Sequence, residues 1–447
     1  MNINETERLI ENFDKYSCYL DNKLERDIED NRKGQFVIKI KDKNGNKINN
    51  ALVHVKQISH EFKFGANLFH LDQFEDELRR KKYRKHFKNL FNYAVAPLYW
   101  DTLEPVEGEP RFSAETSLHI NRRPPIDTIT QFCRSNNIRL KGHCLVYNSF
   151  QPDWISDDNR KLKMQIERRI KAIAERYPDD FEDMDVINEM ISIYKNCYKG
   201  NGARNLQITD ERDYEKWSFE TAKKYFPYAR KFWNEGMEES LGSSYCGTRS
   251  FYYMMLEKLL RENIEVEGIG IQYHAFSDYE HLKYSCNPLR IMDAFDCYGK
   301  FDLPIHISEV SIPSYSASKY ECDLQAELTK RLYKLWFGRK NCSAIVWWNL
   351  ADGTAYKDEN AFRAGLIDNN CDKKAAYKEI EKLINSEWRT EFETKTYGEL
   401  RFSGFYGEYD ITVTTEEKRI VKRIKLFGDN TGFDNRLCDF RSVEFLL

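Results

Sequence analysis

Short runs of apolar residues alternate with amphipathic stretches through the middle of the chain, from about residue 61 to residue 385. Between Asp158 and Tyr177 the apolar residues fall on one helical face and Pro178 follows, which predicts a helix there. Strand-like runs that alternate with helices are typical of parallel sheets, so we predict an α/β fold of the (β/α)8 (TIM barrel) type. An open doubly wound sheet is the alternative, but no glycine-rich fingerprint supports a nucleotide site in it. The eight candidate strands read FKFGANL, YAVAPLYW, IRLKGHCLVY, MDVINE, ARKFWNE, EGIGIQYH, LPIHISEV and SAIVWWNL.

The two ends of the chain differ from the middle in their pattern of apolar and polar residues. Residues 34–57 hold two β-rich runs around Asn44-Gly45, which predicts a β hairpin after a charged, partly helical start. Several more strand runs follow residue 386. We expect these C-terminal strands to pack with the hairpin as one small accessory β domain. Two separate β elements attached to the barrel are the alternative. Such a domain would brace the barrel, which we favour, or bind carbohydrate. The expected regions are 1–60, 61–385 and 386–447.

Composition and charge exclude some partners and leave others open. Lys and Arg number 69 against 72 Asp and Glu, so a net charge of -3 gives no electrostatic case for nucleic acid or an acidic membrane. No window is apolar for long enough to span a bilayer. The 11 cysteines are scattered without a CxxC pair, so we expect free thiols, no metal site and no cofactor. The oligomeric state is not predicted.

The N-terminal stretch MNINETERLIENFDKYS lacks the pattern of a secretory signal. The sequence as it stands therefore predicts a cytoplasmic protein, or a secreted one if a signal peptide has been removed.

Polar and aromatic residues stand where several candidate strands end. In a barrel these ends converge on one axis, so their side chains are expected to meet. Glu189 and Glu309 are 309 − 189 = 120 residues apart, about three βα units, which places them across the barrel mouth. Two carboxylates across a cleft suit cleavage of a glycosidic bond, in which one protonates the leaving oxygen and the other attacks the anomeric carbon. A helix cap or a solvated surface charge is the alternative for either one. The strand-end residues are His143, Asn188-Glu189, Asn234-Glu235, Gln272, His274, Glu309 and Trp347-Trp348.

The motifs around these residues resemble glycoside hydrolase family 10, the β-1,4-xylanases. DVINE is similar to that family's acid/base motif and IHISEVSI to its nucleophile motif. The other matching segments follow in family order from about residue 85 to residue 380. They read LEPVEG, GHCLVYNSFQPDWI, FPYARKFWNE, GIGIQYHAF and WWNLADGTAY.

The resemblance implies a retaining mechanism with two glutamates. Glu189 would be the general acid and then the general base, and Glu309 the nucleophile, with carboxyl groups roughly 5–5.5 Å apart. The negative charge of the nucleophile would keep its partner protonated near neutral pH. The resemblance further implies that His274 orients the nucleophile and that Asn188 binds the sugar 2-hydroxyl. It assigns His143, Gln272 and Trp348 to the subsite before the scissile bond.

The chain departs from the family pattern on the glycone, or non-reducing, side. VAPLYW keeps Trp100 but lacks the family's Glu-Asn pair and the Lys before that Trp. Tyr147-Asn148 stand in place of a Trp-His pair, and Tyr356 in place of a second Trp. The resemblance places all of these in the glycone subsites, where lost polar groups change which sugars are tolerated. A long insertion at about residues 192–217 could narrow the cleft.

These observations favour an endo-β-1,4-xylanase acting on xylan or xylo-oligosaccharides. An exo-acting or oligosaccharide-specific β-glycosidase on another β-glycan is a second hypothesis, favoured by the altered glycone side. A barrel that only binds glycans is a third, and retention of both glutamates with His274 counts against it. A metal-dependent hydrolase is disfavoured because no HxH ligand set appears among the 9 histidines.

Overall fold

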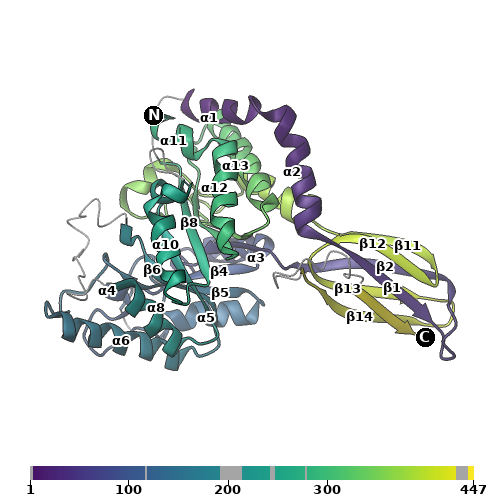
Figure 1. Ribbon diagram of the computed structural model, residues 1–447, viewed down its shortest axis with the longest axis horizontal. Coiled ribbons are helices and arrows are strands. Elements are labelled where there is room, and N and C mark those ends of the chain that lie inside the picture. Colours follow the sequence, from purple (N-terminus) through teal and green to yellow (C-terminus); the bar gives the residue numbers. More distant parts are fainter. Residues whose placement is uncertain (1–3, 116–117, 192–213, 242–246, 277–278, 429–440) are drawn as a thin grey trace.

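The barrel is the larger of the two parts seen in the computed structural model, which describes residues 4–115, 118–191, 214–241, 247–276, 279–428 and 441–447. Eight parallel strands close in the order β10-β3-β4-β5-β6-β7-β8-β9, with helices packed around them (Figure 1). This confirms the predicted (β/α)8 fold, and each of the eight predicted runs supplies one barrel strand. The strands are β3 (Lys63–Asn67), β4 (Tyr93–Pro97), β5 (Arg139–Tyr147), β6 (Phe181–Asn188), β7 (Arg230–Glu235), β8 (Gly268–His274), β9 (Ile305–Ser311) and β10 (Cys342–Trp347).

The helices form where amphipathic stretches meet clear start signals. The predicted helix after Asp158 is α6 (Asn159–Arg176), and the Asp158 side chain caps it by accepting a hydrogen bond from the Lys161 N–H at 2.9 Å. None of the helices within the described ranges is long and apolar enough to cross a membrane. The other helices are α1 (Asn4–Asp14), α2 (Ser17–Arg32), α3 (Glu77–Leu90), α4 (Trp100–Leu103), α5 (Ile126–Ser135), α8 (Tyr214–Tyr225), α9 (Met237–Leu241), α10 (Phe251–Arg261), α11 (Tyr279–Ser285), α12 (Pro288–Tyr298), α13 (Lys319–Gly338) and α14 (Ala375–Lys382).

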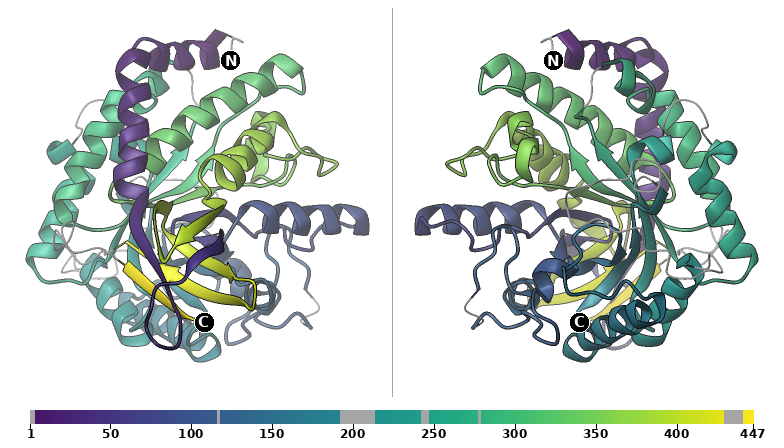
Figure 2. Two further views of the ribbon diagram at one scale, coloured as in Figure 1. Left: turned by 90° about the vertical axis from the view of Figure 1, so that its right-hand side faces the viewer. Right: turned by 90° about the vertical axis from the view of Figure 1, so that its left-hand side faces the viewer.

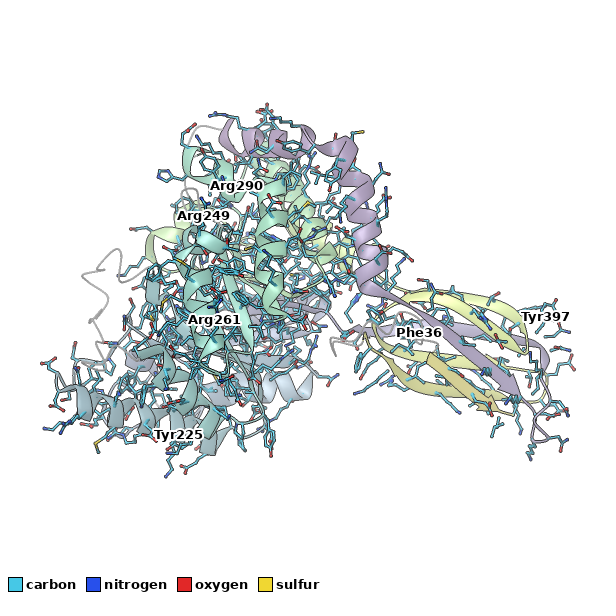
Figure 3. All side chains as sticks on the ribbon, viewed as in Figure 1. Phe36, Tyr225, Arg249, Arg261, Arg290 and Tyr397 are labelled. Carbon is cyan, nitrogen blue, oxygen red and sulfur yellow. The ribbon has the colours of Figure 1, made fainter. Side chains whose placement is uncertain are left out.

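A second core lies in a two-sheet β sandwich that stands to one side of the barrel (Figure 1). One sheet has the order β12-β1-β15 and the other β11-β2-β13-β14, so strands from both ends of the chain share each sheet. Figure 3 shows Phe36, which is buried, near the barrel end of the sandwich, and Tyr397, which is exposed, at the opposite tip. The division of the chain into domains at residues 60 and 385 stays a prediction. The strands are β1 (Lys33–Lys41), β2 (Asn49–His60), β11 (Glu391–Tyr397), β12 (Glu399–Phe405), β13 (Gly407–Thr414), β14 (Arg419–Leu426) and β15 (Arg441–Leu446).

The predicted hairpin over residues 34–57 is wrong in its pairing. The turn is present: Gly45 has φ 86°, and Asp42 accepts hydrogen bonds from the Asn44 and Asn46 N–H groups. Beyond one bridge between Lys41 and Lys47, however, β1 pairs with β12 and β15, while β2 pairs with β11 and β13. Both strands carry several buried apolar residues, and placing the strands in opposite sheets of the sandwich packs these residues in one core. A local pattern predicts the turn but does not select the partner strands.

Aromatic residues join the sandwich to the amino-terminal end of the barrel strands. Phe337 stacks on Trp388 with ring centroids 4.1 Å apart and lies 6.1 Å from Phe405 of β12. Arg139, the first residue of β5, donates to the carbonyl of Glu61, which follows β2. Figure 2 shows the sandwich strands in front of the barrel when the molecule is viewed from that side. Since functional groups of such barrels sit at the carboxyl ends of the strands, the sandwich lies at the opposite end from the candidate site.

Arg32, the last residue of α2, ties the start of the sandwich to the barrel. Its guanidinium donates to the carbonyls of Phe337 and Arg339 and, at 2.6 Å, to that of Cys342. The first two carbonyls lie at the end of α13, where backbone acceptors lack helical partners and attract positive charge. One side chain therefore satisfies three acceptors between α13 and β10.

We expect Arg32→Ala to lower the free energy of unfolding by roughly 2–4 kcal/mol, because three carbonyls lose a charged donor. Denaturant unfolding followed by circular dichroism measures the change. Arg26→Ala is the matched control, since Arg26 is an exposed arginine of the same helix, and its effect is expected within about 0.5 kcal/mol. Equal stability of the two variants would show that Arg32 does not hold this junction.

Candidate active site

Glu189 leaves the end of β6 in an uncommon backbone conformation. Its φ is 49°, in the left-handed region that non-glycine residues seldom adopt. The Glu189 N–H donates to the carbonyl of Asn234 on β7 at 2.9 Å, which ties the turn to the neighbouring strand. Such conformations persist where surrounding contacts hold them, and they cluster at functional sites.

Two side chains hold the Glu189 carboxylate. The Tyr147 hydroxyl donates to Oε2 at 2.6 Å and Gln272 Nε2 donates to Oε1 at 2.8 Å. Burial raises the pKa of Glu189, and the charge of Glu309 raises it further, while the two hydrogen bonds act in the opposite direction. The environment therefore favours a protonated Glu189 more than water would.

Glu309 lies on β9 and has a different environment. Asn234 Nδ2 donates to its Oε1 at 2.8 Å, and His274 Nε2 lies 3.1 Å from its Oε2. An ionised carboxylate only accepts hydrogen bonds, so Nε2 carries the hydrogen. Burial lowers the pKa of His274, but the hydrogen bond and charge of Glu309 outweigh it, so the pKa is raised. The contact expected between His274 and Glu309 is present, and its role in orienting a nucleophile stays a prediction.

Asn234 links the two carboxylates. Its Nδ2 also donates to Asn188 Oδ1 at 2.8 Å, and Gln272 Nε2, which binds Glu189, lies 3.5 Å from the same oxygen. Asn234 is fully buried and its Oδ1 accepts from Ser308. A chain of amides thus runs from Glu189 through Gln272, Asn188 and Asn234 to Glu309.

His143 is held from below by a buried ion pair. Its Nδ1 lies 2.8 Å from Asp185 Oδ2, and Lys141 Nζ lies 2.5 Å from Asp185 Oδ1. Because Asp185 accepts, Nδ1 carries the hydrogen and Nε2 points toward Glu309, 3.9 Å from its Oε1. Trp348 completes this side, with its ring centroid 5.3 Å from that of His143.

The structure joins most of the predicted site residues through direct contacts. Tyr356 lies farther out and reaches the group through Phe150, whose ring centroid is 5.4 Å away. Asn148 is buried, and its Oδ1 has no hydrogen-bond partner within the described residues. Residues 192–213 of the insertion lie outside the described residues. The residues in the connected group are His143, Tyr147, Asn188, Glu189, Gln272, His274, Glu309 and Trp348.

The sequence pattern named Asn234 and Glu235 as a strand end but did not include either among the site residues. The repeated Asn-Glu pair, at 188–189 and 234–235, was the available signal. Asp185 was also missed, because an acid inside a buried strand gives no local sign of pairing with His143.

Glu235 is a third carboxyl group near the site and is fully buried. Its Oε1 accepts from the Ile191 N–H and from Trp233 Nε1, both at 2.9 Å. Burial raises the pKa of Glu235 to about 8. A neutral carboxyl thus holds the backbone two residues after Glu189.

Comparison with known proteins identifies the family of this chain. The model of "Glycosyl hydrolase family 10" matches residues 56–383, more than half of the chain. The chain belongs to glycosyl hydrolase family 10.

This family 10 chain is 27% identical over 406 residues to the anti-sigma-I factor RsgI6 of Acetivibrio thermocellus, covering 90% of this chain and 47% of that protein. It is 24% identical over 414 residues to endo-1,4-beta-xylanase 2 of Arabidopsis thaliana, covering 90% and 34%. It therefore spans less than half the length of these two relatives.

Solved family 10 structures share the fold. Xylanase 10B of Thermotoga maritima matches with a TM-score of 0.57 at 23% identity, covering 73% of this chain and 96% of that one. Xylanase 10B of Thermotoga petrophila, solved in complex with xylobiose, matches with the same TM-score, identity and 73% coverage of this chain, and with 95% of its own. At this identity the likeness concerns the fold alone.

We expect Tyr147→Phe to raise the pKa of Glu189, because the variant loses a hydrogen bond that stabilises the charged carboxylate. Titration of carboxyl-labelled glutamate by ¹³C NMR measures the shift. Tyr225→Phe is the matched control, since Tyr225 donates to a remote glutamate, Glu167, at 2.9 Å and lies at the edge of the barrel (Figure 3). An unchanged pKa in Tyr147→Phe would show that this hydrogen bond does not govern the carboxylate.

Glu235 makes stability depend on pH. Its folded pKa of about 8 lies above the ordinary glutamate pKa of 4.5, so the stability contributed by its neutral form is complete below pH 4.5 and is lost as the pH rises through 8. Glu235→Gln keeps a neutral acceptor, so its melting temperature should gain on the wild type as the pH rises from 4.5 to 8. Thermal unfolding across this range measures the difference, and a constant difference would contradict a raised pKa.

Proposed function

We propose that this protein is a retaining glycoside hydrolase that cleaves β-1,4-xylosidic linkages in xylan or xylo-oligosaccharides. The observation that carries the proposal is the pair Glu189, which directly follows β6, and Glu309, which lies near the end of β9. Strands β7 and β8 stand between them, and one chain of amides connects the two carboxyl groups. The environments of the two carboxyl groups differ as the reaction requires, because one must donate a proton and the other must be ionised. The raised pKa of Glu189 suits a proton donor, and the donors around Glu309 suit an anion.

In the first step Glu189 gives its proton to the leaving oxygen while Glu309 attacks the anomeric carbon. His274 and Asn234 hold the two oxygens of Glu309, so the attacking carboxylate has a fixed orientation. A glycosyl ester forms on Glu309 and the aglycone leaves.

In the second step Glu189, now ionised, takes a proton from water while the water oxygen attacks the anomeric carbon. The bond between that carbon and Glu309 breaks, which releases the sugar and restores the Glu309 carboxylate. Asn188 Oδ1 accepts from Asn234, which fixes the Asn188 amide and leaves its NH2 group to donate to a sugar hydroxyl. Such a contact can strengthen as positive charge develops at the anomeric centre.

Xylan is favoured as substrate by membership of family 10 and by likeness to proteins named endo-1,4-beta-xylanases. Exo action on oligosaccharides or another β-glycan is the alternative, because VAPLYW lacks the family's Glu-Asn pair and Lys, and Tyr147-Asn148 replace its Trp-His pair on the glycone side. The products separate the two: mixed oligomers from polymer indicate endo action, and monosaccharide alone indicates exo action.

Glycan binding without hydrolysis is a second candidate function. The likeness to an anti-sigma-I factor extends over 90% of this chain, and that protein's name describes regulation rather than hydrolysis. Binding of xylo-oligosaccharides by a wild-type protein that cleaves none of them would favour this candidate.

Glu309→Ala is expected to lower kcat/KM on xylo-oligosaccharides by at least about 10³-fold, because no covalent intermediate can form. Glu189→Ala is expected to lower kcat/KM on xylo-oligosaccharides by about 10²–10⁴-fold. The effect on the first step, transfer of the sugar to Glu309, should be much smaller with aryl glycosides, because their leaving group needs no proton. Reducing-end assays and release of the aryl group measure the two effects.

Glu175→Ala is the control, since Glu175 lies exposed on α6 and pairs at 3.5 Å with Lys171, which is also exposed. It should keep wild-type activity. Full activity on a xylo-oligosaccharide in either Glu189→Ala or Glu309→Ala would refute the mechanism.

A further inference from the structure

Two adjacent arginines lie buried at the barrel mouth, outside the group around the glutamates. Arg122 and Arg123 belong to the loop between α4 and α5 and are 5% and 6% exposed. Arg122 Nη2 donates to Asn349 Oδ1 at 3.0 Å, just after Trp348. Arg123 Nη1 donates to the Arg122 carbonyl at 3.0 Å, and the Arg122 N–H donates to Gln73 Oε1 at 3.0 Å. Both guanidiniums also contact aromatic rings, so the pair borders the candidate active site.

Aromatic rings separate the arginines from the site by one layer. The guanidinium of Arg123 lies 4.1 Å from the centre of the Tyr99 ring and 5.3 Å from that of Phe69. Tyr99 is 5.4 Å from the His143 ring, and Phe69 is 5.1 Å from Trp348. Tyr99 also directly precedes Trp100, where the family resemblance led us to expect the lysine of the glycone clamp.

Within the described part of the chain neither arginine forms an ion pair with a carboxylate, and Nε of each is buried without a hydrogen-bond partner. The acids whose charges act on them are Asp101 on Arg123 and Glu359 on Arg122, and neither makes a contact of ion-pair length. Burial raises the pKa of Asp101, which weakens it further as a counter-ion. Burial lowers the pKa of Arg122 only to about 10, so Arg122 is charged at neutral pH.

Two like charges held together away from water are costly. Removing a charged group from water costs several kcal/mol even after the protein relaxes, whereas a cation–π contact returns about 0.5–2 kcal/mol. The ring contacts therefore do not replace a counter-ion. Each guanidinium presents a planar fork of donors that matches a carboxylate.

We propose that Arg122 and Arg123 bind the carboxylate of a uronic acid unit carried by the glycan on the glycone side of the cleft. This inference rests on the proposed glycosidase function and narrows its substrate class to acidic β-glycans, such as xylan with glucuronosyl branches. A uronic acid supplies the missing negative charge, and the surrounding rings shield the ion pair from water.

Calorimetry on the full chain carrying Glu309→Ala, which prevents turnover, tests the proposal with two probes. One probe is a xylo-oligosaccharide with a glucuronosyl branch near its non-reducing end, and the other is the same molecule with that carboxylate reduced to an alcohol. The acidic probe should bind about 10–100-fold more tightly, as a charge-assisted hydrogen bond of about 1.5–3 kcal/mol implies.

The preference should disappear when Arg122→Gln or Arg123→Gln is added, and should persist with Arg261→Gln. Arg261 is 77% exposed, lies on α10 and serves as the matched control (Figure 3). Equal affinity for the two probes would overturn the proposal. If wild-type protein cleaves neutral xylo-oligosaccharides, that failure concerns the arginines alone; if it neither binds nor cleaves them, the proposed function fails as well.

The free protein separates a binding role from a structural one. Arg123→Met keeps the side-chain volume and removes a buried charge that has no ion-pair partner, so its melting temperature should equal or exceed that of the wild type. A lower melting temperature together with unchanged preference for the acidic probe would show that Arg123 only fills the mouth of the barrel, and would overturn the proposal.

Discussion

Closure of eight parallel strands around one axis is the constraint on which the rest of the molecule depends. It brings the carboxyl ends of β5 to β10 to one mouth, so residues as distant in sequence as His143 and Trp348 come into ring contact. It also encloses charged side chains inside the barrel, where each must find a partner. Lys63 binds Asp183, and Lys141 binds Asp185, within the closed interior.

This interior pairing continues into the candidate site. Asp185, which is paired with Lys141, binds one ring nitrogen of His143, and the other ring nitrogen points toward Glu309. The buried ion pair therefore fixes the orientation of the His143 imidazole. Asn234 plays the corresponding part between the strands, because one amide group binds both Asn188 and Glu309. A buried amide that loses one of its partners leaves a polar group unsatisfied, so these positions are fixed together rather than one by one.

The part of the mouth beside His143 and Trp348 is built differently. There Tyr99 stands where the family resemblance had led us to expect a lysine, and Arg123 packs against the rings of Tyr99 and Phe69. Polar side chains with defined partners surround the two glutamates, whereas positive charge without an ion-pair partner in the described residues lies one ring layer away. The two regions share the barrel mouth, so under the proposed function the chemistry and the choice of sugar are set by different residues.

The sequence by itself determined the eight barrel strands, the helix after Asp158 and the strand-end positions of Glu189 and Glu309. These follow from periodicity and capping, which depend on residues close together in the chain. Only the tertiary structure decided that β1 and β2 enter different sheets, that Asn234 joins the two carboxylates and that Asp185 holds His143. Each of these depends on partners tens to hundreds of residues away, and a strand or a buried amide carries no local signal of which distant group completes its hydrogen bonds.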